Sequence, residues 1–80
     1  MSTPHGLFLL SHDDMQTRPD RTERALRVFF PVQAKDYFAA LHRGDSVLIR
    51  YGARDALGAL AGRLGAHGFN SSVRKLETID

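Results

Sequence analysis

The segment from Gly44 to Leu76 constrains the fold more than any other part of the chain, because two apolar runs flank a glycine-bounded amphipathic stretch. Three successive aliphatic residues, Val47–Ile49, favour a central strand that is covered on both faces. The leucines that follow Gly52 recur at helical spacing. The segment therefore predicts a strand over Ser46–Tyr51, a turn at Gly52, a helix from about Ala53 to about Ala66, a turn at Gly68 and a strand over Phe69–Leu76.

Three glycines lie within the predicted helix: Gly58, Gly62 and Gly65. Each glycine makes the helix about 1 kcal/mol less stable than alanine would in a helix interior. Their presence therefore indicates that another backbone segment lies close to this helix. Two partners for that approach stay open. We favour an internal contact with the sheet or another helix, and the alternative is a homodimer formed through this glycine-bearing face.

Two further elements are predicted before Gly44. The compact apolar run Gly6–Leu10 is typical of a buried strand. Gln33–Arg43 is an amphipathic helix, and Gly44 stands where a left-handed residue commonly ends a helix. We expect residues 1–5 to be a tail and residues 77–80 to be frayed.

The segment Asp20–Phe30 is ambiguous between a helix and a strand. Asp20 and Glu23 have the spacing of a helix-capping box. Against this, Ala25–Phe30 alternates and is rich in branched and aromatic residues, which favours a strand. We interpret it as a strand that ends at Pro31.

These elements predict a single domain in the α+β class, an α/β two-layer sandwich. Its four-stranded mixed sheet would be joined by parallel crossovers and carry two helices on one face. The other face would be partly open. Alternate members of the pairs Phe8/Leu10, Arg27/Phe29 and Leu48/Arg50 would line it, giving a mixed apolar and basic docking surface.

Composition narrows the chemistry that the chain can perform. The 80 residues contain no cysteine, which excludes disulfides and thiol chemistry. The net charge is +2, and no apolar run approaches the length of a membrane-spanning helix. We therefore expect a cytoplasmic protein with no membrane partner.

Candidate catalytic and ligand sites are weak. His12 beside Asp13 and Asp14 invites a metal or acid–base role, but adjacent strand residues point to opposite faces, so a strand exit is the favoured interpretation. The turn at Gly52 exposes a helix N-terminus near Arg50 and Arg54, yet it lacks the glycine pattern of phosphate-binding loops. We expect no catalytic residue, cofactor or metal site.

The order of landmarks from Leu26 to Leu76 resembles the TusA/SirA family of sulfur-carrier proteins. Phe30-Pro31-Val32-Gln33 stands where that family has Cys-Pro-x-Pro, Gly44-Asp45 where it has a Gly-Asp turn, and Gly68-Phe69 near its glycine turn. The resemblance implies the fold only. Phe30 replaces the cysteine that carries sulfur, so the resemblance counts against sulfur transfer.

The sequence favours a non-catalytic binding protein that docks on a larger protein or ribonucleoprotein complex, as an inhibitor or adaptor. Anti-CRISPR proteins and other small proteins of mobile elements are similar in size and in their lack of motifs. A nucleic-acid-binding module that uses arginines on the open sheet face is the alternative. The residues expected to bind the partner are Arg21, Arg24, Arg27, Phe29, Arg50, Arg54, Arg74 and Lys75.

Overall fold

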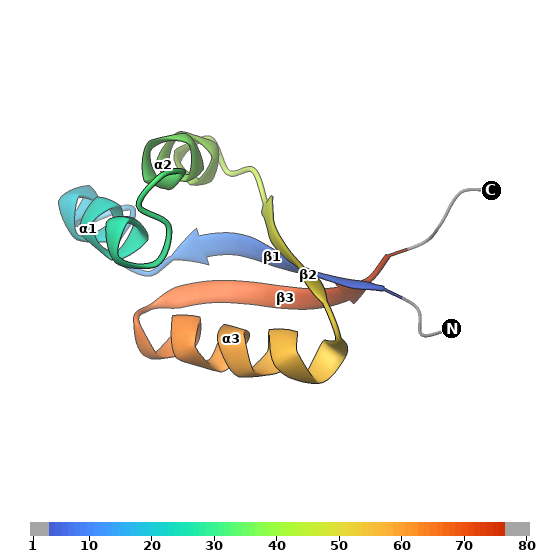
Figure 1. The fold of residues 1–80 in the computed structure, drawn as a ribbon. Helices are drawn as coiled ribbons and strands as arrows, with labels where there is room; N and C mark the ends of the chain where they lie inside the picture. Colours follow the sequence, from blue (N-terminus) through green and yellow to red (C-terminus); the bar gives the residue numbers. More distant parts are fainter. Residues whose placement is uncertain (1–3, 77–80) are drawn as a thin grey trace.

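The computed structural model describes residues 4–76, which form three helices and three strands (Figure 1). In chain order, these elements are β1 (His5–His12), α1 (Pro19–Phe29), α2 (Ala34–His42), β2 (Val47–Gly52), α3 (Arg54–Ala66) and β3 (Phe69–Lys75). The two predicted helices and the strands of the Gly44–Leu76 segment are confirmed, as is the strand at Gly6–Leu10.

The sheet has the order β2-β1-β3, and β1 pairs antiparallel with both neighbours. Since β2 and β3 are each antiparallel to β1, they run in the same direction with β1 between them. The unit β2-α3-β3 is therefore a split β-α-β motif. The prediction of a four-stranded mixed sheet is wrong, because the described residues form three strands and every neighbouring pair is antiparallel.

The missing strand is the segment Ala25–Phe30, in which Ala25 to Phe29 belong to helix α1 and Phe30 is the C-cap of that helix. Pro19 occupies the first turn, where its fixed φ and absent N–H suit a helix start. Thr22 and Leu26 lie four residues apart and are both completely buried, so the segment has a helical inner face. The landmark strand before Pro31 in the sulfur-carrier resemblance is thus a helix here.

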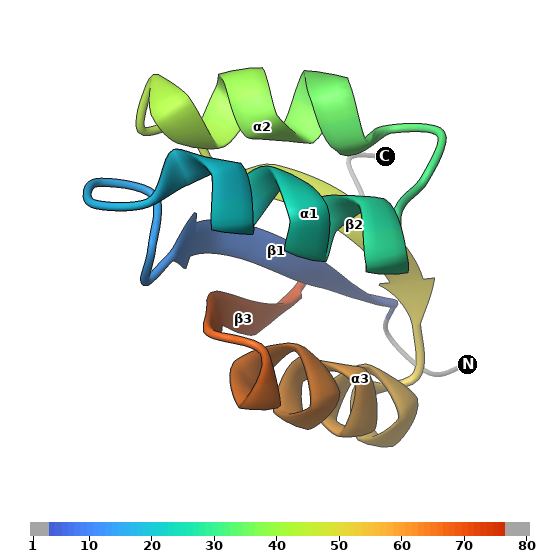
Figure 2. The ribbon, with the colours of Figure 1, turned by 90° about the vertical axis from the view of Figure 1, so that its left-hand side faces the viewer.

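All three helices cover the same face of the sheet. Leu7 and Leu9 of β1 are 0% exposed and lie in one apolar core with Leu26 of α1, Leu41 of α2 and Leu57 of α3. Figure 2 shows α1 beside α2, with α3 next to β3. The prediction of two helices on one face is therefore wrong. Three helices lie there, because the segment predicted to be the strand Ala25–Phe30 forms part of α1.

The central strand is β1, whereas the sequence favours Ser46–Tyr51 for that position. The aliphatic run that favoured a central strand arises from an irregular register between β1 and β2. Leu7 pairs with Arg50 and Phe8 pairs with Leu48, so Ile49 is an extra residue in β2. At this bulge Ile49 contacts the core. Three consecutive aliphatic residues thus reflect a bulged edge strand, not a strand covered on both faces.

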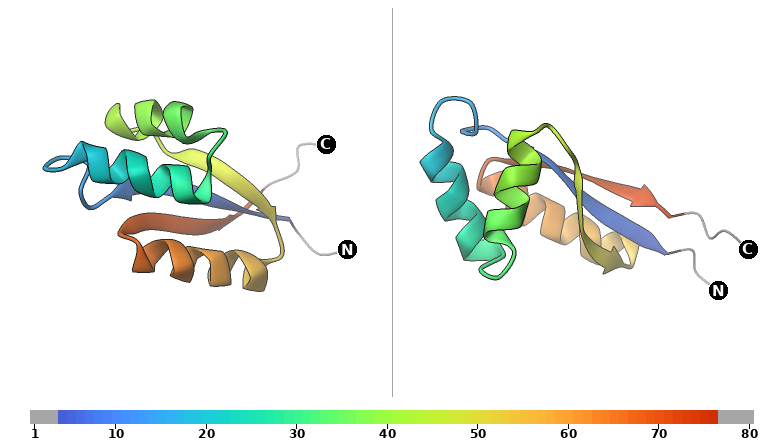
Figure 3. Two further views of the ribbon diagram at one scale, coloured as in Figure 1. Left: turned by 60° about the vertical axis from the view of Figure 1, so that its left-hand side comes forward. Right: turned by 90° about the horizontal axis from the view of Figure 1, so that it is seen from above.

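The two glycines predicted to follow helices have the expected conformation, whereas Gly52, expected at a turn, is the last residue of β2. Gly44 follows α2 and Gly68 follows α3, and each has φ of 86°, a left-handed conformation that suits glycine. The loop at Gly68 feeds directly into β3, and Figure 3 (right) shows β3 along the outer edge of the sheet.

Candidate binding surfaces

The structure does not bring the eight predicted partner-binding residues together. Phe29 packs towards the core, and the other seven residues fall on four separate places: the outer side of α1, the helix-covered side of the β2 edge, the end of the sheet beside α3, and the sheet face that no helix covers. Only the last of these places has the shape and composition of a docking surface.

Arg21, Arg24 and Arg27 lie exposed on α1. Arg27 forms an ion pair with Glu23 one turn earlier on the helix. Val28 on the same helix is 70% exposed. This side of α1 is a mixed-charge surface with an isolated exposed aliphatic residue, which is ordinary for a solvated helix.

Phe29 and Arg50 have different surroundings from those expected. The Phe29 ring is partly buried and meets the His67 ring edge-on at 4.9 Å and the Phe69 ring at 6.0 Å, so it contributes to the core side of the molecule. Arg50 is exposed, but it pairs with Leu7, which places it on the helix-covered side at the free edge of β2.

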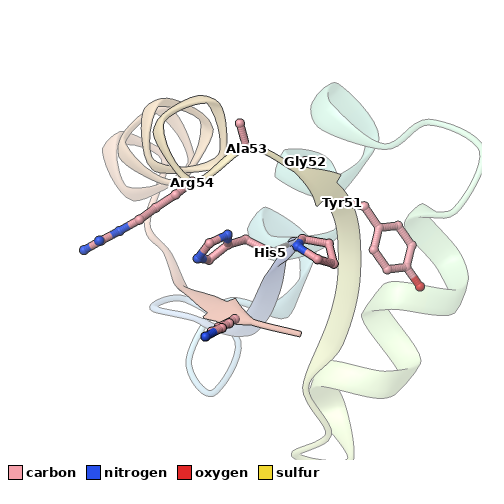
Figure 4. Close-up of a pocket in the computed structure, with 7 residues that line it drawn as sticks. His5, Tyr51, Gly52, Ala53 and Arg54 are labelled. Carbon is pink, nitrogen blue, oxygen red and sulfur yellow. The ribbon is translucent and has the colours of Figure 1, made fainter. Parts of the chain in front are cut away.

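Arg54 and Lys75 line an open pocket of roughly 750 Å³ where α3 begins. His5 and Gly52 also line it, so the pocket lies beside the N-terminus of α3 (Figure 4). In Figure 4 the Tyr51 side chain extends to the far side of β2 from His5. Two basic side chains, a histidine and a helix N-terminus would suit an anion, yet both Arg54 and Lys75 are exposed to solvent.

The remaining predicted residue, Arg74, lies on the sheet face opposite the helices, which we call the open face. Side chains alternate along a strand, so residues next to the buried Leu7 and Leu9 point to this face. The paired registers place their neighbours on it as well. The central part of the open face consists of Gly6, Phe8, Leu48, Tyr51, Ser72, Arg74 and Leu76, and Asn70 with Ser11 lies at its far end.

The centre of the open face is apolar. A Cβ atom added to Gly6 would lie 2.7 Å from Cδ1 of Leu48 and 3.2 Å from Cδ2 of Leu76. The two leucine side chains, one from each side of β1, therefore lie over the glycine and nearly meet there. Gly6 lets them form a continuous apolar strip across all three strands.

Aromatic and charged groups extend this strip. The Arg74 guanidinium lies over the Phe8 ring, 5.1 Å from its centroid, in a cation–π contact. Tyr51 is 68% exposed and pairs with Gly6. At the far end of the same face, the Asn70 amide donates hydrogen bonds to Ser11 Oγ (2.9 Å) and Asp13 Oδ1 (3.1 Å).

Sequence reasoning anticipated an open face lined by alternate members of Phe8/Leu10 and Leu48/Arg50. The structure places Phe8 and Leu48 there, together with Gly6, Tyr51 and Leu76, which the sequence reasoning missed. Assigning Arg27 and Phe29 to a strand placed the wrong neighbour beside β1. The signal that could have found the missed residues is Gly6 itself, since a glycine inside a strand often marks a close approach of other groups.

His12 is a structural residue in the described part of the chain. Its ring is 6% exposed, and its Nδ1 accepts a hydrogen bond from the Asp14 N–H (3.2 Å), so the ring hydrogen sits on Nε2. Nε2 then donates to the His67 carbonyl (2.8 Å), and the Thr22 hydroxyl donates to Nδ1 (2.6 Å). Both ring nitrogens thus join β1 to α1 and to the α3–β3 turn.

The glycines of α3 do not serve an internal contact. A Cβ atom built at Gly58, Gly62 or Gly65 would meet nothing within 4 Å among the described residues. The favoured interpretation of an internal close approach is therefore wrong, and the homodimer alternative stays a hypothesis.

The described residues also bear on metals and membranes. No three histidine, aspartate or glutamate side chains within residues 4–76 lie where they could jointly hold a metal ion. No helix in the same range combines the length and the hydropathy needed to cross a bilayer.

Comparison with known proteins does not assign this chain to a family. No protein-family model matches the sequence, and a search of curated proteins finds no significant match.

Proposed function

We propose that this is a non-catalytic binding protein that docks on a larger protein through the open face. The observation that carries the proposal is the composition of that face. An antiparallel sheet with one solvated face normally alternates apolar residues inside with polar residues outside. Here Phe8, Leu48, Tyr51 and Leu76 occupy outer positions that polar residues would fill on a solvated sheet.

The same face fits the usual make-up of protein interfaces. Such interfaces have an apolar centre and are enriched in aromatic residues and arginine, with polar groups at the rim. Phe8 and the two leucines supply the centre, while Tyr51 and Arg74 supply the enriched residue types. Asn70, Ser11 and Asp13 supply a hydrogen-bonding rim.

A protein partner is favoured over a nucleic acid. A nucleic-acid site concentrates arginine and lysine on one face, because most of its affinity comes from phosphate contacts. The expected arginines are instead spread over α1, the β2 edge and the α3 pocket, and Arg74 is the one member of the predicted set on the open face. Affinity for a protein through an apolar centre should change little with salt, whereas phosphate binding should fall steeply.

His12, the histidine that invited a catalytic role, holds parts of the fold together. Both nitrogens of His12 are engaged in hydrogen bonds that hold β1 to α1 and to the α3–β3 turn. The residue is also 6% exposed, so a substrate would have little access to its ring.

A matched pair of variants tests the docking surface. Tyr51 and Val28 are 68% and 70% exposed and lie on the open face and on α1, respectively. The wild-type protein, Tyr51→Asp and Val28→Asp would each be used as immobilised bait in extract from the cell that produces the protein, at low and high salt. Co-purifying proteins and nucleic acids would be identified by mass spectrometry and sequencing.

We expect one protein partner to be retained at high salt by the wild type and by Val28→Asp, and to be lost from Tyr51→Asp. Equal retention by both variants would place the interface elsewhere. Retention of nucleic acid alone, lost at high salt, would replace the proposal with the nucleic-acid alternative.

A further inference from the structure

The outer edge of β3 is unpaired within residues 4–76. The sheet order ends at β3, and no other ribbon lies beyond it in Figure 3 (right). Edge strands of monomeric proteins are commonly protected by proline, by bulges or by inward-pointing charges, since free N–H and C=O groups attract other strands. β3 has no proline, its two charged residues, Arg74 and Lys75, lie at its C-terminal end, and the extra residue in its pairing with β1 lies on β1.

We propose that β3 pairs antiparallel with β3 of a second copy of this chain, around a two-fold axis at Ser72. The two sheets would join into one six-stranded sheet. An interface with two-fold symmetry must be self-complementary, so every contact made by one copy is repeated by the other. The residues on either side of Ser72 meet this requirement.

Charge complementarity is the observation that selects a second copy as the occupant. Pairing about Ser72 sets Asn70 opposite Arg74 of the second copy, on the open face. Directly opposed residues in antiparallel strands have Cβ atoms about 5 Å apart. Asp13 is hydrogen-bonded to the Asn70 amide, so its carboxylate would come within reach of the second copy's Arg74 once that side chain leaves the Phe8 ring. The axis creates this Arg74–Asp13 pair twice, once on each side.

The position of α3 leaves room for the second copy. Leu60, on one flank of α3, packs against the common core. At 100° per residue, the three glycines lie on the flank opposite Leu60, where an added Cβ atom would meet nothing within 4 Å among the described residues. Two copies of α3 would approach each other there with glycine surfaces, which permit close helix contact.

Pairing would also enlarge the proposed docking surface, a consequence that rests on the proposed function. Three strands of about 7 residues present about 300 Å² in projection, well below the roughly 800 Å² per partner of a standard interface. A six-stranded sheet doubles this area. The β3 pairing itself does not depend on any partner and is tested without one.

Charge exchange between two variants provides the test. The wild type should show a concentration-dependent monomer–dimer equilibrium by sedimentation equilibrium. Arg74→Glu and Asp13→Arg should each shift it towards monomer, because each places like charges opposite one another twice. An equimolar mixture should restore the dimer as a heterodimer. In that heterodimer the introduced glutamate faces the introduced arginine on one side of the axis, and the native Arg74–Asp13 pair forms on the other. Far-UV circular dichroism would confirm that each variant is folded.

Control variants separate this pairing from general charge effects and from the helix face. Arg24→Glu, the same charge change on α1, should leave the equilibrium unchanged. Gly62→Leu should give a folded monomer, because a side chain there meets nothing within one copy. The proposal is overturned by a wild type that is monomeric at all concentrations. It is equally overturned by a dimer that both charge variants retain or that their mixture fails to restore.

Discussion

The two faces of β1 have different relations to the rest of the molecule. On one face, Leu7 and Leu9 are fully buried beneath three helices. On the other face, Gly6 lies beneath the side chains of Leu48 and Leu76, and the Phe8 ring contacts the Arg74 guanidinium. The alternation is that of a sheet with one solvated face, but the residue types on the open side are not those that water would favour.

This difference separates what folds the chain from what is left for binding. A side chain on the covered face is fixed by contacts from every helix, so its replacement should change stability. A side chain on the open face has few such contacts, so its replacement should change binding and leave stability nearly intact. The loss of stability should therefore be greatest for a residue in the core.

Leu9→Ala should destabilise the protein by about 2–5 kcal/mol, since it removes a fully buried side chain and leaves a cavity in the core. Leu48→Ala, on the open face, is the matched control and should cost less than about 1.5 kcal/mol because its site is partly open to water. Urea unfolding monitored by circular dichroism would measure both. Equal losses would show that the open face contributes to the core as much as the covered face does.

Gly68→Ala should cost more than Gly44→Ala. Both glycines have φ of 86°, so each alanine carries the same left-handed penalty of about 1–2 kcal/mol. At Gly68 the new Cβ atom would also lie 3.1 Å from Nε2 of His12, whereas nothing lies within 4 Å at Gly44. The excess cost measures how firmly His12 is held on the covered side. Indistinguishable melting temperatures for the two variants would contradict the role assigned to His12.

Gly62→Ala should have the smallest effect, and of opposite sign. Alanine gains up to about 1 kcal/mol over glycine in a helix and meets no neighbour at this exposed position. Thermal unfolding at low protein concentration, where a dimer would dissociate, should show a higher melting temperature. A decrease would reveal an internal contact of α3 that the structure does not contain.

The sequence predicted most of the local structure and less of the arrangement. Gly44, Gly68 and the leucines of α3 are local signals, and the elements that they mark lie where expected. The prediction of a strand at Ala25–Phe30 was wrong because the alternation of its residues is also compatible with a strand. The groups that stabilise the helix are distant in sequence: the Thr22 hydroxyl is hydrogen-bonded to His12, which lies before the loop. The predicted strand order was wrong for the same reason. β1 lies in the centre of the sheet because it pairs with β2 and β3, which are far from it in sequence.

The sequence predicted the type of candidate site, an open sheet face, but not the residues that form it. A partly open sheet face lined by alternate members of Phe8/Leu10 and Leu48/Arg50 followed from alternation, but which members line it, and which residues complete it, depends on how the strands pair. Their positions depend on the register with β1 and on the bulge at Ile49, which no local pattern announces. Arginine content was a poor guide, because the fold disperses these side chains over four surfaces.

Site-specific photo-crosslinking in the producing cell would show which surface the partner occupies. A benzophenone-bearing phenylalanine analogue would replace Tyr51 on the open face and, as a control, Val32, which is 86% exposed in the α1–α2 loop. We predict a discrete adduct with one larger protein from position 51 and none from position 32. The same adduct from position 32, with none from position 51, would contradict the assignment of the open face as the docking surface.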